Sequence, residues 1–323
     1  MSQAPLLDIQ DVQVWFPVRR GVFSRVRQHI KAVQGVSLSI RPGEIVGLVG
    51  ESGCGKSTLA RAIMMLQPPA SGRILVDGRD VYAMNDMERR AVRRDVQVIF
   101  QDPYASLNPR MPVYAIITEG MVAHGLIKPA QQEDAAASLL RDVGLGADAL
   151  YRYPHEFSGG QRQRIGIARA LSLKPRLVVC DEAVSALDVS VQAQVINLLL
   201  DLRERYRLSY LFISHDLSTV NFIADRIAVM YLGRLVEEGT TEQVMNQPRH
   251  PYTQALLAAV PNVGGPRGRA AALAGEIPSV AKPPPGCPFH TRCPHAMEMC
   301  RQSYPASLQF DGHRVSCFLY GNK

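Results

Sequence analysis

Long apolar runs are missing from this chain of 323 residues. It has no stretch of about 18 consecutive apolar residues, the minimum for a helix that crosses a bilayer. No charged-then-apolar signal sequence opens it either. We therefore expect a cytosolic protein that is peripheral to the membrane and does not span it.

Aromatic residues are also scarce, at 7% of the chain, and no aromatic-rich RNA motif is found. The formal net charge is +7, but the basic residues are spread along the sequence. Such a distribution favours a solvated basic surface, with anionic lipid headgroups as suitable neighbours. We predict no nucleic-acid partner.

A glycine-rich motif follows an apolar run, IVGLVG, which is typical of a buried strand. The motif is GESGCGKST and has every fixed position of a phosphate-binding loop between a strand and a helix. Its lysine would reach the β and γ phosphates of ATP, and its serine would bind Mg²⁺. A simple glycine turn is the weaker alternative. The predicted nucleotide contacts are Gly50, Glu51, Ser52, Gly53, Cys54, Gly55, Lys56, Ser57 and Thr58.

A second apolar run, in RLVVCDE, ends at two carboxylates. Asp181 is a candidate metal ligand, and Glu182 is a candidate for polarising the water that attacks the γ-phosphorus. A lone acidic pair would more simply be a solvated strand end. Beside a phosphate loop, the catalytic interpretation is stronger.

The third motif, FSGGQRQR, precedes a helical stretch. A helix that begins after Ser158, Gly159 and Gly160 would present its first N–H groups to an anion, with Gln161 beside them. An ordinary helix cap is the alternative.

With these motifs in this order, the chain resembles the ATPase subunits of ABC transporters in the dipeptide and oligopeptide importer family. The resemblance implies that Gln101 is the Q-loop residue and a contact of the nucleotide and Mg²⁺, that Ser185 to Asp188 form the D-loop, and that His215 is the catalytic switch histidine. It also implies that Ser158 and Gly160 clamp ATP bound to a partner ATPase.

The same resemblance places Phe16 against the adenine ring, although a core aromatic is the alternative. Adjacent Trp15 should point to the opposite face of the strand. One departure is Ala183, where the family usually has proline. We expect altered loop flexibility there rather than lost hydrolysis.

The predicted fold class is α/β: a P-loop ABC ATPase domain over residues 5–240, with a mixed-sheet core, an antiparallel β subdomain and a helical subdomain at about 102–165. A small cysteine-rich extension covers residues 241–323 and includes a Pro/Gly-rich linker. Residues 19–31 are expected to form an exposed basic insertion.

The extension contains four of the six cysteines: Cys287, Cys293, Cys300 and Cys317. Disulfides are unlikely in the cytosol, so we predict a four-thiolate metal site. The gaps are wider than in usual zinc sites, and the family resemblance favours a [4Fe-4S] cluster, with zinc as the alternative. His290, His295 and His313 are interpreted as solvated loop histidines, or else as substitute ligands. For Cys54 and Cys180, small apolar packing is a sufficient explanation.

The resemblance implies ATP-driven import of dipeptides or oligopeptides. The expected partners are a second, related ATPase subunit in a heterodimer, two membrane permease subunits and an extracytoplasmic peptide-binding protein. An importer of nickel, glutathione or antimicrobial peptides would have the same catalytic residues. A soluble ABC ATPase is a further alternative, although those usually carry two cassettes or a long coiled coil, and neither is present here.

Overall fold

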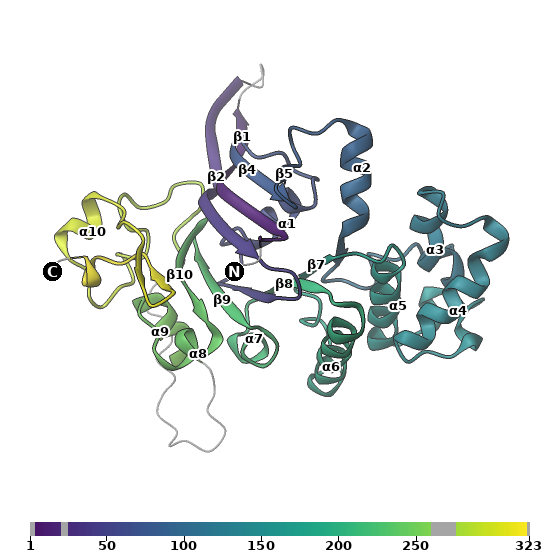
Figure 1. Cartoon of the computed structure of the whole chain (residues 1–323). Helices are drawn as coiled ribbons and strands as arrows, with labels where there is room; N and C mark the ends of the chain where they lie inside the picture. Colours follow the sequence, from purple (N-terminus) through teal and green to yellow (C-terminus); the bar gives the residue numbers. More distant parts are fainter. Residues whose placement is uncertain (1–3, 21–24, 260–275, 322–323) are drawn as a thin grey trace. The chain divides into compact units, whose positions relative to one another are not determined.

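The computed structural model describes residues 4–20, 25–259 and 276–321 (Figure 1). They form two compact units. The first contains residues 4–6, 40–44 and 83–213, and the second contains residues 7–39, 45–82 and 214–321. The predicted Pro/Gly-rich linker falls largely in 260–275, outside the described residues.

The first unit contains a parallel sheet in the order β8-β7-β6. β7 and β8 are almost entirely buried, the continuous apolar pattern expected of parallel strands covered on both faces. Its elements are α2 (Asp86–Asp95), β6 (Val96–Ile99), α3 (Val113–Ala123), η1 (Pro129–Gln131), α4 (Gln132–Asp142), η2 (Ala147–Ala149), η3 (Pro154–Glu156), α5 (Gly159–Leu171), β7 (Leu177–Asp181), α6 (Val189–Tyr206) and β8 (Ser209–Ser214).

The segment between β6 and β7 contains α3, α4 and α5. α3 packs on α4 and α5, and the three helices lie together in Figure 1. Their contacts bury apolar side chains such as Ile117 and Leu140, which are 0% exposed. Amphipathic sequences of this kind form stable helices chiefly because one face is buried against neighbours.

The second unit contains two sheets. One is antiparallel, in the order β2-β1-β4-β5. In the other, β3 pairs in parallel with β9, and β9, β10, β12 and β11 follow as antiparallel neighbours. The elements are β1 (Leu7–Arg20), β2 (Arg25–Ile40), β3 (Ile45–Val49), α1 (Lys56–Ile63), β4 (Ser71–Val76), β5 (Arg79–Asp80), α7 (Leu217–Ile223), β9 (Arg226–Tyr231), β10 (Arg234–Thr240), α8 (Thr241–Asn246), α9 (Pro251–Ala258), α10 (Glu298–Gln302), β11 (Leu308–Phe310), β12 (His313–Val315) and η4 (Phe318–Tyr320).

The prediction of an exposed basic insertion at residues 19–31 is wrong for residues 19–20 and 25–31. β1 continues to Arg20 and β2 begins at Arg25, so these parts belong to long strands. From Arg25 to Ala32 the sequence RVRQHIKA places Val, Ile and Ala at every second or fourth position, compatible with the two-residue period of a strand. Residues 21–24 lie outside the described chain.

The C-terminal extension is part of the second unit. β12 pairs with β10, with Val315 opposite Glu237, so the tail adds two strands to the sheet that contains β3. Figure 1 shows the yellow C-terminal strands beside β10. Among the residues that the structure describes, none of the helices combines the length and apolar character needed to cross a bilayer.

Candidate nucleotide and cysteine sites

The phosphate-loop motif, Gly50 to Thr58, begins directly after buried β3 and runs into the first turn of α1. Two of its glycines are fixed by close backbone approach: a Cβ on Gly50 would lie 2.1 Å from the carbonyl oxygen of Met230, and one on Gly55 would lie 2.3 Å from that of Ala32. Gly55 also has φ +108, which L-residues rarely adopt. A Cβ on Gly53 would meet nothing within 4 Å, so this side of the loop is open.

Lys56 is 4% exposed and lies against its own loop. Its Nζ donates to the carbonyl oxygens of Gly50, at 2.7 Å, and of Glu51, at 3.1 Å. The N-cap residue of α1 is Gly55, which makes no side-chain cap hydrogen bond, and the positive dipole end of a helix suits an anion. Ser57 is half-buried and Ser52 is exposed.

Gln101 and Glu182 form a hydrogen-bonded pair in the first unit. The Nε2 of Gln101 donates to Oε2 of Glu182 at 2.9 Å, although 81 positions separate them. Glu182 has φ +49, a left-handed conformation. Its N–H donates to the carbonyl oxygen of Ile213 at 3.1 Å, and the hydroxyl of Ser185 donates to its carbonyl oxygen at 2.9 Å. These bonds hold the carboxylate just beyond β7, where half-buried Asp181 ends the strand.

The signature turn begins α5. Ser158 is its N-cap: the Ser158 Oγ accepts from the Gln161 N–H at 3.3 Å, and Oε1 of Gln161 accepts from the Ser158 N–H at 3.0 Å. The sequence interpretation left the first N–H groups of the helix open, but this capping box uses one of them. Gly160 allows α6 to approach, because a Cβ there would lie 2.4 Å from Cγ1 of Val191. Asp188 is exposed at the N-terminus of α6.

His215 and Phe16 belong to the second unit. His215 is exposed directly after β8, and Asp216 next to it caps α7 by accepting from the N–H groups of Ser218 and Thr219. Phe16 is half-buried near the end of β1. Trp15, its neighbour, lies 5.0 Å from the Nζ of Lys31.

The motifs agree with the matches to known families. Residues 33–185 match the ABC transporter family model, and residues 236–300 match the model of the oligopeptide/dipeptide transporter C-terminal region. The oligopeptide transport ATP-binding protein AppF of Bacillus subtilis is 49% identical over 324 residues, covering 99% of this chain and 98% of the relative. The chain belongs to this ABC transporter family. The dipeptide transport ATP-binding protein DppF of Escherichia coli is 47% identical over 317 residues, covering 98% of this chain and 95% of that relative.

Solved structures support the fold of this ABC ATPase. The dimeric post-hydrolysis structure of the ATP-binding cassette MJ0796 with ADP and Pi has a TM-score of 0.64 and 26% identity, and covers 73% of this chain and 98% of its own. A structure of cbiO1 from Clostridium perfringens has the same TM-score at 24% identity, covering 76% and 92%. The predicted ABC ATPase fold with a mixed sheet is therefore confirmed.

All four tail cysteines of the ABC ATPase line one small, largely apolar cavity of about 20 Å³, roughly the space of one water molecule. Burial raises the pKa of Cys287 to about 11 and also raises the pKa values of Cys293 and Cys317. Across the described ranges, no group of three or more His, Cys, Asp or Glu side chains has the arrangement of a metal site. The donor types fit a thiolate-bound metal, but this cavity would have to widen for a cluster.

The three tail histidines differ in their surroundings. His290 and His295 line the cysteine cavity, and the ring Nδ1 of His290 lies 2.8 Å from the carbonyl oxygen of Cys287. His313 is 1% exposed, and its Nε2 lies 2.7 Å from Oε1 of Glu237. The interpretation of His313 as a solvated loop histidine is therefore wrong, because it lies in β12, which packs beside β10.

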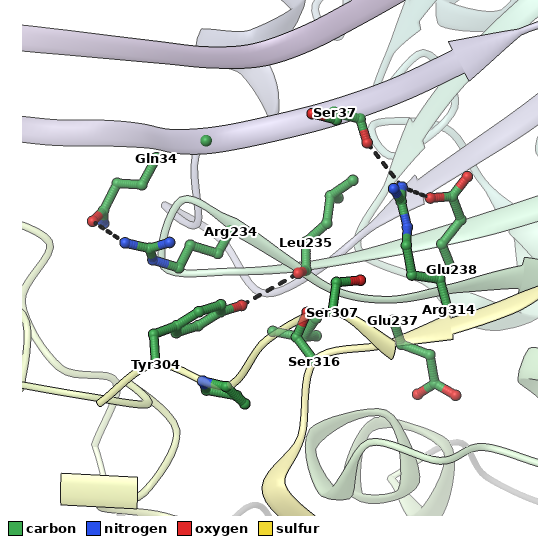
Figure 2. Close-up of a pocket in the computed structure, with 13 residues that line it drawn as sticks. Gln34, Ser37, Arg234, Leu235, Glu237, Glu238, Tyr304, Ser307, Arg314 and Ser316 are labelled. Carbon is green, nitrogen blue, oxygen red and sulfur yellow. Dashed lines mark hydrogen bonds and ion pairs between the residues drawn. The ribbon is translucent and has the colours of Figure 1, made fainter. Parts of the chain in front are cut away.

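The tail also meets β2 and β10 across a cavity of about 280 Å³ with a mixed polar and apolar lining (Figure 2). Its two arginines already have protein partners. Arg314 binds Glu238 and the carbonyl oxygen of Ser37, and Arg234 lies 4.3 Å from the ring of Tyr304. The cavity therefore lies at the interface where the tail of this ABC ATPase packs on β2 and β10.

Sequence reasoning missed two residues that contact the phosphate loop, Tyr252 and Arg292. Tyr252 lies in the segment RHPYTQALLAAVP, where no local pattern indicates a contact with the phosphate loop. No local pattern distinguishes Arg292 from other basic residues of the tail.

Proposed function

We propose that this chain is the ATP-hydrolysing subunit that powers import of dipeptides or oligopeptides across the bacterial inner membrane. It would act from the cytoplasmic face as a peripheral subunit. The observation that carries the substrate class is the match of residues 236–300 to the oligopeptide/dipeptide transporter C-terminal region. The names of AppF and DppF support it.

The chemistry that we propose is hydrolysis of the γ-phosphate bond by water. Glu182 would accept a proton from that water, and its hydrogen bond to Gln101 at 2.9 Å supports a coupled role for the two side chains. His215 would hydrogen-bond the γ-phosphate, and Lys56 would leave the loop carbonyls to bind the β and γ phosphates.

The base and the metal have their own proposed contacts. Phe16 would stack on adenine, and its half exposure leaves part of the ring accessible. Ser57, Gln101 and Asp181 carry the oxygen donors that Mg²⁺ prefers. When bound, Mg²⁺ would offset negative charge on the phosphates.

A second ATPase completes the proposed assembly. Ser158, Gly159, Gly160, Gln161 and Asp188 would face ATP held by that second cassette, and the described dimer of MJ0796 supports a paired arrangement. We propose a related but distinct subunit as the partner, together with two permeases and an extracytoplasmic peptide-binding protein. Size measurement of the chain alone with MgATP tests this point, since a stable homodimer would contradict the heterodimer.

For the tail we propose that a [4Fe-4S] cluster is bound by four cysteines, namely Cys287, Cys293, Cys300 and Cys317. The cluster would cross-link the four positions of the tail from which these cysteines come. Their common cavity supports a shared ligand. Its small volume favours the alternative, a single zinc ion bound by four thiolates. Anaerobic purification followed by iron, sulfide and zinc analysis separates the two. Equimolar zinc without iron would refute the cluster, and a Cys300→Ser variant should lose the metal in either case.

The transport proposal is tested by ATP hydrolysis of the chain co-purified with its membrane partners, with and without peptide-loaded receptor. Loaded receptor should stimulate turnover. Glu182→Gln should lower kcat by about 100-fold or more, the usual contribution of a general base. Glu204→Gln, an exposed position on α6, is the matched control. A soluble ABC ATPase would be favoured if peptide-loaded receptor left the rate of hydrolysis unchanged and no permease co-purified with the chain. Stimulation only by nickel or glutathione receptors would change the substrate class.

A further inference from the structure

Glu51, the second residue of the phosphate loop, is bound by an arginine from the cysteine-rich tail. The two terminal nitrogens of Arg292 donate to the two carboxylate oxygens of Glu51, at 2.7 and 3.0 Å, across 241 positions of sequence. The Arg292 side chain is only 3% exposed, and that of Glu51 is 19% exposed. A bidentate pair with this little solvent fixes both position and orientation.

The backbone of Glu51 is held as well. Its N–H donates to the hydroxyl of Tyr252 on α9 at 2.9 Å, and its carbonyl oxygen accepts from Lys56 Nζ at 3.1 Å and from the Cys54 N–H at 3.2 Å. Tyr252 is fully buried. Two tail residues therefore hold the first turn of the loop.

Arg292 has a rigid support of its own. Its N–H donates to the carbonyl oxygen of Phe289 at 2.9 Å. The Phe289 ring packs on Tyr231 and Tyr252, with centroids 5.3 and 5.4 Å apart. Arg292 immediately precedes Cys293. The same short segment thus carries a cysteine of the proposed metal site and the guanidinium that reaches the phosphate loop.

The negative charge of Glu51 is unfavourable in a loop that binds a triphosphate. An uncompensated carboxylate there would repel the nucleotide, and partial burial would strengthen that repulsion relative to water. Removing one partner of a buried pair leaves the other charge unpaired. The guanidinium of Arg292 therefore does two things: it orients Glu51 and it neutralises the charge that Glu51 brings.

We propose that Arg292 is a positioning residue for nucleotide binding, through which the cysteine-rich tail sets the affinity of the phosphate loop for MgATP. This inference rests on the proposed ATPase function. It predicts that the tail acts on binding of ATP and not on the bond-breaking step, since the contact of Arg292 with the loop is made through Glu51, which is not one of the proposed catalytic residues.

The test is a titration of the full-length chain with a fluorescent ATP analogue and Mg²⁺ at fixed salt. Arg292→Met should weaken binding at least 10-fold, and Arg292→Lys should recover part of that loss. The decisive variant is the double substitution Glu51→Gln with Arg292→Met, which removes the unpaired carboxylate and should bind at least about 3-fold more tightly than Arg292→Met alone. In hydrolysis assays, Arg292→Met should raise KM and leave kcat within about 3-fold.

Arg314→Met is the matched control, because it removes another tail arginine, one that binds Glu238 and Ser37 rather than the loop. It should leave nucleotide affinity unchanged. Binding by Arg292→Met within 2-fold of the original chain would overturn the proposal. So would a double variant as weak as Arg292→Met, which would indicate a structural role alone. Failure of the original chain to bind MgATP would instead refute the proposed function.

Discussion

The three glycines of α5 should respond differently to the same Gly→Ala change. On Gly160 the new Cβ would lie 2.4 Å from Cγ1 of Val191, a separation at which α5 and α6 must shift. Overpacking of this kind costs about 1 to 3 kcal/mol. On Gly166 the Cβ would meet nothing within 4 Å, so the higher helix propensity of alanine should stabilise the chain by about 0.5 to 1 kcal/mol.

Gly159 provides an intermediate case, because its Cβ would lie 3.7 Å from Cδ2 of Leu187, an ordinary contact. We therefore expect the order of stability Gly166→Ala, then Gly159→Ala, then Gly160→Ala, with the extremes separated by about 2 kcal/mol. Urea unfolding followed by circular dichroism measures this difference, provided that the slope with denaturant is unchanged.

A second substitution isolates the cause. Val191→Ala removes the atom that the Gly160→Ala methyl would strike, so the double variant should regain most of the lost stability. Equal unfolding free energies for Gly160→Ala and Gly166→Ala, or no recovery in the double variant, would show that the approach of α6 to α5 does not determine the glycine at this position.

Three further results are expected. Asp216→Ala should destabilise the chain by about 1 kcal/mol in urea unfolding through loss of the α7 cap. Burial alone would raise the Asp216 pKa, but hydrogen bonds from α7 lower it overall, so this contribution is present above the ordinary carboxyl pKa and should disappear as pH falls below it. Glu237→Gln should cost about 1 to 3 kcal/mol and speed proteolysis of the tail, since an amide would face the backbone donors and His313 that Glu237 now accepts from. Gly50→Ala should abolish measurable ATP binding, because its methyl would lie 2.1 Å from the backbone oxygen of Met230; binding within 2-fold would contradict the loop geometry.

The phosphate loop could be predicted from sequence because its determinants are contiguous. An apolar run specifies a buried strand, and closely spaced glycines specify a backbone that side chains would obstruct. The structure explains two of these glycines, because a Cβ on Gly50 or Gly55 would clash with the carbonyl oxygen of a residue distant in sequence. The family resemblance implied that Gln101 contacts the nucleotide and Mg²⁺, whereas its hydrogen bond to Glu182 is seen only in the structure.

Other features depend on contacts that no local pattern encodes. Arg292 is one of several basic residues in the tail, and only the fold brings it to Glu51. His313 resembled a loop histidine because β12 has only three residues, too few to show a strand period. The long β1 and β2 strands were obscured in the sequence by a run of basic residues, which a strand can nevertheless contain.

The pairing of β12 with β10 has a consequence for shortened forms of this chain. A cassette cut after residue 240 would leave one side of β10 with unpaired N–H and C=O groups, an open template for another strand. The full chain ends that sheet instead with β11, a strand of three residues. The last forty residues therefore protect the protein from edge-to-edge self-association, and a truncated cassette would aggregate even if its nucleotide loop were intact.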